Sequence, residues 1–184
     1  MRRPQLTVSP GFWLLLAGFW FLDEWGLLPP FLLAGGLHEA AHFGALALLD
    51  VPVRGLELRA DGAVIRAELR GQSREGWAIA AGPACNLLLA LLFRHAWPLF
   101  SLCNLGLGCC NLLPLSPLDG GRLCLLLLPR WLGEAGMLLC QLLHWGTLTL
   151  VVICGVWASC GLHYGLLPLL PAGFFLWKLP NPFA

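Results

Sequence analysis

Apolar residues dominate this chain to an extent that a water-soluble fold cannot accommodate. Of its 184 residues, 58% are hydrophobic and 11% are charged, whereas soluble domains contain about 45–50% and about 25%. A domain of this size cannot hide so much apolar surface from water, so lipid must be the solvent for much of it. The composition therefore predicts a polytopic membrane protein.

Six apolar stretches approach the length of about 20 residues that a membrane-spanning helix needs. They lie at 11–22, 27–49, 76–93, 98–116, 135–156 and 158–177. Residues 50–75 differ, because charged and apolar residues alternate there on both sides of Asp61-Gly62, a dipeptide typical of a tight turn between strands. We therefore expect an all-α polytopic membrane protein with about six transmembrane helices and a small β-hairpin between the second and the third.

Positive charge predicts the orientation of these helices. If the N-terminus is cytosolic and six helices alternate, Arg94 alone of the 11 Lys and Arg residues falls outside the cytosol. Such an excess on the cytosolic side is typical of membrane proteins, so both termini are predicted to be cytosolic. The net charge of +1, without a basic run, gives no indication of nucleic-acid binding.

The strongest chemical signal, His38-Glu39-Ala40-Ala41-His42, lies inside the second apolar stretch. Residues four apart share one face of a helix, so both imidazoles can bind one metal ion with Glu39 beside it. Ionisable groups at this depth are costly unless they are paired or ligate a metal. The alternative is a helix whose polar side chains bond to neighbouring helices for packing.

A third ligand is expected because catalytic zinc sites commonly have three protein ligands and leave the fourth position to water. Asp119 is the leading candidate, within N-L-L-P-L-S-P-L-D-G-G at residues 111–121. Prolines end the helix there, and we expect the two glycines to let the backbone bend so that the carboxylate turns toward the metal. The alternative is an interfacial Asp in a capped turn.

Three motifs together resemble the site-2 protease family of intramembrane zinc metalloproteases. They are H-E-A-A-H in the second stretch, G-P-A-C-N at 82–86 and N-L-L-P-L-S-P-L-D-G-G after the fourth stretch, in the order and spacing of that family. The compact hairpin and the P-L-D-G-G-R form are most similar to the branch that processes sporulation sigma-factor precursors. The resemblance covers residues 8–130, with further membrane helices at 131–184, and implies one intramembrane metalloprotease domain over 1–184. Members of this branch often carry a CBS domain, and we expect none here.

The resemblance also implies roles for the matching residues. One Zn²⁺ per chain would be held by three ligands: His38, His42 and Asp119. Glu39 would be the general base, taking a proton from the attacking water and returning it to the leaving amine. Asn111 would donate to the developing oxyanion or hold the substrate backbone, with an interhelical hydrogen bond as its alternative. For Asn86, positioning of the site and structural packing are both open.

The implied activity is endoproteolysis of a membrane-associated or transmembrane protein near the cytosolic leaflet of a bacterial cell membrane. The branch resemblance implies a sporulation sigma-factor precursor as substrate and membrane partners that hold the protease inactive. The alternatives are a catalytically silent membrane scaffold and a metal-handling membrane protein. Glu39 argues against both, since neither scaffolding nor ligation needs a carboxylate beside the first histidine.

The substrate poses a problem of its own, because a transmembrane helix hides its peptide bonds and must unwind locally before it is cut. The hairpin near residues 53–70 would offer an edge strand on which an unwound segment can pair. A cytosolic lid without direct substrate contact is the alternative role of the hairpin.

Overall fold

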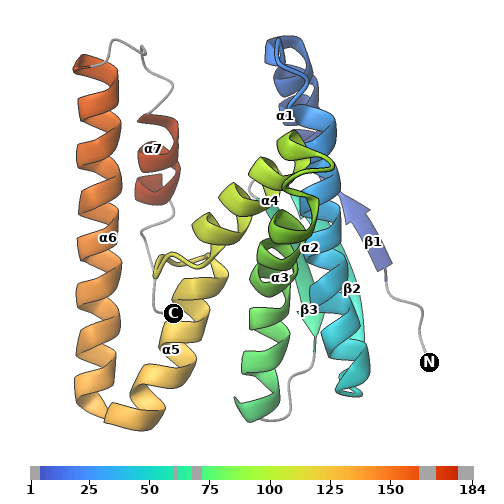
Figure 1. Ribbon diagram of the computed structural model, residues 1–184. Coiled ribbons are helices and arrows are strands. Elements are labelled where there is room, and N and C mark those ends of the chain that lie inside the picture. Colours follow the sequence, from blue (N-terminus) through green and yellow to red (C-terminus); the bar gives the residue numbers. More distant parts are fainter. Residues whose placement is uncertain (1–4, 60–61, 68–71, 162–168, 178–184) are drawn as a thin grey trace. The chain divides into compact units, whose positions relative to one another are not determined.

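The computed structural model describes residues 5–59, 62–67, 72–161 and 169–177. Asp61 and both chain termini, which enter the predictions above, lie outside these ranges. The described elements follow one another as shown in Figure 1. Their bounds are β1 Gln5–Val8, α1 Pro10–Leu22, α2 Leu28–Leu48, β2 Val53–Arg59, β3 Gly62–Ala67, α3 Gln72–Phe93, α4 Pro98–Asn111, α5 Asp119–Leu132, α6 Glu134–Cys160 and α7 Leu170–Trp177.

The predicted helical architecture is confirmed, and the chain is an integral membrane protein. Three described helices are long and apolar enough to cross a bilayer: Leu28–Leu48, Glu75–Phe93 and Glu134–Cys160. Helix α1 is apolar but shorter, α4 ends at Asn111 and α7 has eight residues. The number of six spans therefore stays a prediction, as does the orientation of the termini.

The first of two compact units comprises residues 1–109, and its sheet is larger than the predicted hairpin. Strands β2 and β3 pair antiparallel as expected, with Leu56 opposite Ile65. Strand β1 adds a third strand, parallel to β2, and the Ser9 N–H extends this pairing by donating to the Leu58 carbonyl at 2.8 Å. The hairpin prediction missed β1 because its four residues are too short to show a strand period beside a long apolar run.

Helix α2 packs against α3 in this unit. Its first turn is capped from outside, since the two Asp23 carboxylate oxygens accept the N–H groups of Leu27 and Leu28 at 2.7 and 2.8 Å. These N–H groups have no partner within a helix, so the carboxylate fixes where α2 begins. Apart from Leu28 at the start of the helix, the buried residues of α2 recur every four positions: Pro30, Ala34, His38, His42 and Leu46. Both histidines therefore belong to the face that meets α3.

The second unit comprises residues 110–184. Within it α5 packs on α6, and α6 packs on α7. The segment Arg122–Arg130 lies within the 14-residue helix α5. Helix α6 continues to Cys160, beyond the end at 156 that hydropathy predicts.

Candidate metal centre

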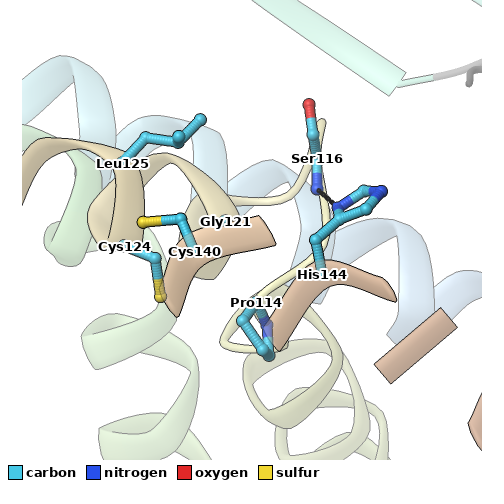
Figure 2. A pocket seen from close by; sticks show the side chains of 7 residues that line it. All are labelled: Pro114, Ser116, Gly121, Cys124, Leu125, Cys140 and His144. Carbon is cyan, nitrogen blue, oxygen red and sulfur yellow. Dashed lines mark hydrogen bonds between the residues drawn. The ribbon is translucent and has the colours of Figure 1, made fainter. Parts of the chain in front are cut away.

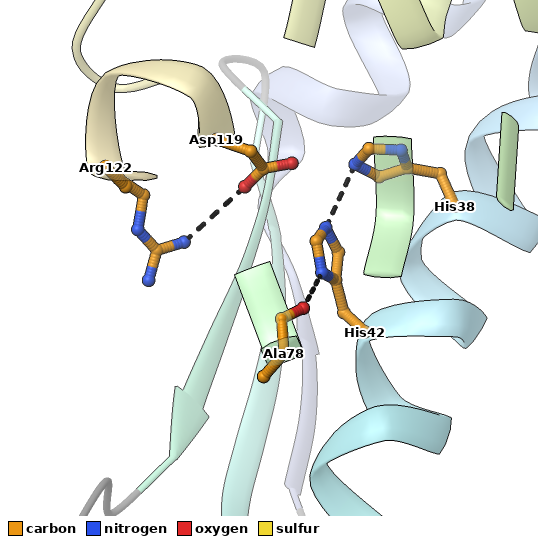
Figure 3. A network of polar contacts seen from close by, with 5 residues as sticks. All are labelled: His38, His42, Ala78, Asp119 and Arg122. Atoms are coloured by element: carbon orange, nitrogen blue, oxygen red, sulfur yellow. Dashed lines mark hydrogen bonds and ion pairs between the residues drawn. The ribbon is translucent and has the colours of Figure 1, made fainter. Parts of the chain in front are cut away.

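His38 and His42 lie one helical turn apart on the buried face of α2, and only 5% and 8% of their surfaces are exposed. Their rings are perpendicular, with centroids 4.6 Å apart. Their Nε2 atoms lie 3.1 Å from each other (Figure 3). The predicted pairing of the two imidazoles on one helix face is thus present within the first unit.

Helix α3 fixes the orientation of both rings. The Nδ1 atom of His42 lies 2.7 Å from the Ala78 carbonyl oxygen, and that of His38 lies 2.5 Å from Oδ1 of Asn86. Both oxygens are acceptors, so each Nδ1 carries the hydrogen and donates it. Each Nε2 consequently keeps its lone pair, which is the form of imidazole that ligates metals.

This arrangement fits a metal ion. Two Nε2 lone pairs at 3.1 Å cannot hydrogen-bond to each other, whereas a cation ligated by both converts their repulsion into attraction. Imidazole nitrogen suits zinc, as well as other first-row divalent metals. In histidines that ligate metals, the other ring nitrogen typically donates a hydrogen bond to an oxygen acceptor, as both rings do here.

Gly82 of α3 provides the room for the two rings. A Cβ atom at this position would lie 2.6 Å from Cε1 of His42 and 2.7 Å from Cε1 of His38, which no side chain tolerates. Asn86 follows one turn later, and its Oδ1 accepts the hydrogen bond from Nδ1 of His38. The G-P-A-C-N segment therefore contributes to the histidine pair in two ways. The glycine at its first position leaves space for both rings, and the asparagine at its last position forms a hydrogen bond with His38.

Glu39 is half-buried on α2, next to His38 and off the stripe that packs against α3. The helix period thus places Glu39 on the flank of the histidine face, at a level between His38 and His42. This is a suitable position for a group that handles protons near a metal without ligating it. The structure leaves its catalytic role a prediction.

Asp119 and Asn111 belong to the second unit. Asp119 is the first residue of α5 and is buried, with its carboxylate 3.8 Å from Nη1 of Arg122 one turn later (Figure 3). Asn111 is the last residue of α4 and is half-buried. The sharing of one metal ion by Asp119 and the histidines remains a prediction.

The glycines after Asp119 act differently from the expected backbone bend, because both are inside helix α5. A Cβ on Gly120 would lie 2.5 Å from the Leu113 carbonyl oxygen, and one on Gly121 would lie 2.6 Å from that of Leu115. The two glycines therefore let α5 begin in direct contact with the loop that precedes it. Close packing, rather than a special backbone conformation, explains them.

The same loop is also tied to α6. The Ser116 N–H donates to Nδ1 of His144 at 3.3 Å, beside a small pocket that is also lined by Cys124 and Cys140 (Figure 2). His144 is buried, with 4% of its surface exposed. The backbone just before Asp119 is therefore held by a side chain of the longest helix in the described part of the chain.

Two groups around the histidines were not anticipated from the sequence. The Ala78 carbonyl is a backbone group, and no residue type signals its use. Asn104 bonds to Asn86, and its isolated position in the apolar stretch 98–116 was the available signal, because an amide in a membrane helix needs a partner.

Comparison with known proteins extends these observations. The sequence model of peptidase family M50 matches residues 91–153, which include Asn111 and Asp119 but not the histidine pair. Stage IV sporulation protein FB of Bacillus subtilis is 27% identical over 141 residues, which are 70% of this chain and 49% of that protein. The chain thus spans about half the length of this curated relative.

The fold has a solved counterpart. The site-2 protease from Methanocaldococcus jannaschii superposes with a TM-score of 0.70 over 97% of this chain and 90% of that one, at 19% identity. This similarity shows that the chain has the site-2 protease fold. The resemblance predicted from the three sequence motifs is therefore confirmed by sequence and by fold.

Proposed function

We propose that this chain, which is related to peptidase family M50 and has the fold of a site-2 protease, is an intramembrane zinc metalloendopeptidase. The observation that carries the proposal is the histidine pair: the two Nε2 atoms lie 3.1 Å apart, and each keeps its lone pair because the Nδ1 of the same ring donates to an oxygen. Buried imidazoles arranged in this way are suited to ligate one cation. The similarity to a peptidase family supports zinc as that cation and peptide hydrolysis as the reaction.

The proposed third ligand is Asp119. Its support is chemical, since His38, His42 and Asp119 are all buried and each offers one ligand atom. Three such ligands are the usual protein contribution to a catalytic zinc site. The close contact between the loop and α5 at Gly120 keeps the Asp119 carboxylate on a defined backbone, as a ligand requires.

Zinc bound at this centre would polarise the scissile carbonyl and lower the pKa of the attacking water from about 15.7 to about 7. The Glu39 carboxylate takes the proton of that water and hands it to the nitrogen of the leaving amine. The Asn111 side-chain amide donates a hydrogen bond to the oxyanion or to the substrate backbone. The buried surroundings of the histidines strengthen such electrostatic interactions, because little water screens them.

The proposed substrate is a membrane-associated or transmembrane protein that is cut near the cytosolic leaflet. The position of the histidines inside an apolar helix of 21 residues supports a site within the bilayer. The name of the Bacillus subtilis relative, a sporulation protein, supports a sporulation sigma-factor precursor as the specific client. Inhibitory membrane partners are part of the same proposal.

Metal analysis tests the proposed function without a substrate. We expect the chain purified in detergent to carry about one zinc ion, and His38→Ala, His42→Ala and Asp119→Ala to lose it, because each variant leaves two ligands where three are needed. Elemental analysis measures the content. The matched control is His95→Ala, since His95 is exposed, and it should keep the metal.

The outcomes separate the possibilities. Absence of stoichiometric metal from folded wild-type protein would contradict the protease and leave the membrane scaffold. Retention of zinc by Asp119→Ala alone would remove this residue from the ligand set and leave the histidines in it.

Strand addition of the substrate to the sheet gives a second expected result. Strand β3 is at one edge of the sheet, and successive N–H groups of a strand point to opposite edges. Of Val64→Pro and Ile65→Pro, one therefore removes an outward N–H and the other an N–H facing β2. We expect the variant that lacks the outward N–H to cleave a transmembrane substrate more slowly, at unchanged zinc content. Equal cleavage rates in wild type and both variants would favour a lid.

A further inference from the structure

A second asparagine stands behind the metal centre. Asn104 lies on α4, and neither it nor Asn86 exposes any surface. The Asn86 amide Nδ2 donates to Oδ1 of Asn104 at 2.8 Å and to the Ala34 carbonyl oxygen at 3.2 Å. The Asn104 amide Nδ2 donates in turn to the Phe100 carbonyl oxygen at 2.9 Å. Together with the bond from His38 to Asn86, a continuous chain of side-chain hydrogen bonds joins α4, α3 and α2.

The direction of every bond in this chain follows from its far end. A backbone carbonyl can only accept, so the Phe100 oxygen requires the Nδ2 of Asn104 and turns its Oδ1 toward Asn86. That Oδ1, like the Ala34 oxygen, requires the Nδ2 of Asn86. The Oδ1 of Asn86 is then the atom that meets His38, so the imidazole must carry its hydrogen on Nδ1.

We propose that Asn104 is a positioning residue of the metal centre: it holds the Asn86 amide in one orientation, and thereby keeps the hydrogen of His38 on Nδ1 and the lone pair on Nε2. This inference rests on the proposed metal-binding role of His38. Asn104 acts through Asn86 and contacts neither histidine in the bonds described. From α4, Asn104 would determine which ring nitrogen of His38 on α2 carries the hydrogen.

Loss of the acceptor on Asn104 would loosen this control, because the longer bond to the Ala34 oxygen, at 3.2 Å, would then be the one described bond of Nδ2 that orients the Asn86 amide. Rotation by half a turn would break only this bond, and the amide would present Nδ2 to Nδ1 of His38, which would have to accept. The hydrogen of the imidazole would move to Nε2, where it blocks ligation. Metal binding would have to reverse this rotation, at the expense of affinity. Groups that orient a metal ligand in this way typically change affinity by about 10–100-fold when they are removed.

Three variants distinguish positioning from packing. Asn104→Leu keeps the approximate volume and removes the acceptor. Asn104→Asp supplies a neutral carboxyl, since burial favours the protonated form, and such a group accepts from Asn86 and donates to Phe100 as the amide does. Ser101→Ala is the matched control, because the Ser101 hydroxyl makes another bond between α4 and α3, to the Ala90 carbonyl at 2.6 Å.

Zinc affinity, measured by competition with a chelator, and ¹⁵N spectra of the histidines in zinc-free protein provide the readouts. We expect Asn104→Leu to bind zinc about 10–100-fold more weakly and to show hydrogen on Nε2 of His38, whose signals are assigned by their loss in His38→Ala. Asn104→Asp should resemble wild type in both readouts. Ser101→Ala should lower thermal stability and leave zinc affinity unchanged.

Wild-type zinc affinity and an unchanged His38 spectrum in Asn104→Leu would overturn the inference, as would an equal loss of affinity in Ser101→Ala. Failure of the proposed function looks different, because the wild-type chain itself would then bind no zinc. The nitrogen spectra would in that case still decide whether Asn104 controls the hydrogen on His38.

Discussion

Replacement of Glu39 by glutamine is expected to reduce proteolysis by about 100- to 10,000-fold, the range that general acid–base groups contribute, while the protein keeps its zinc. Gln has nearly the shape of Glu but cannot take up a proton from the attacking water. Glu39 lies off the stripe of α2 that packs against α3, so the substitution does not alter a side chain of that stripe. A single-span reporter protein, cut by wild type and protected by a chelator, serves as substrate in reconstituted vesicles.

The matched control is Glu24→Gln, which makes the same change at an exposed position between α1 and α2 and should cleave at the wild-type rate. Zinc content is measured on the same preparations. Unchanged cleavage by Glu39→Gln would remove this residue from the mechanism. Loss of zinc together with activity would indicate instead that the carboxylate helps to hold the metal.

The sequence predicted the histidine pair because a helix has a fixed period. Spacing by four residues in an apolar stretch places His38 and His42 on one face, and α2 packs by that face. The orientation of the rings was beyond prediction, since it depends on a carbonyl at Ala78 and an amide at Asn86 from another helix. Helix period is local information, whereas the partner of a ring nitrogen is set by how two helices pack.

The glycines illustrate a second limit. A glycine in a motif has two physical explanations, a backbone conformation that other residues avoid and a close approach that a side chain would prevent. The sequence does not distinguish these two explanations. The expectation that Gly120 and Gly121 let the backbone bend after Asp119 was wrong, because both glycines are helical. At Gly120 and Gly121 the neighbour is the backbone of the preceding loop, and at Gly82 it is a pair of imidazoles. Only the packing of distant segments identifies the neighbour.

Replacement of Gly82 by alanine should therefore abolish zinc binding, although it adds only one methyl group and changes none of the proposed ligand residues. The new Cβ would lie closest to Nε2 of His42, the atom proposed to ligate, and within 2.7 Å of Cε1 of His38. Neither ring can retreat, because each Nδ1 is bonded to α3. We expect loss of stoichiometric zinc and of cleavage, measured as for the histidine variants.

Helix propensity makes the control for this substitution informative. Alanine stabilises a helix interior by about 0.8–1.0 kcal/mol relative to glycine, so a Gly→Ala exchange in open space should raise stability. Gly36, two residues before His38, is such a position, since no described heavy atom comes within 4 Å of a Cβ built there. Gly36→Ala should thus keep zinc at equal or higher thermal stability. If Gly82→Ala also kept zinc, the rings would have moved without losing the metal, and the rigid placement of the histidines by α3 would be refuted.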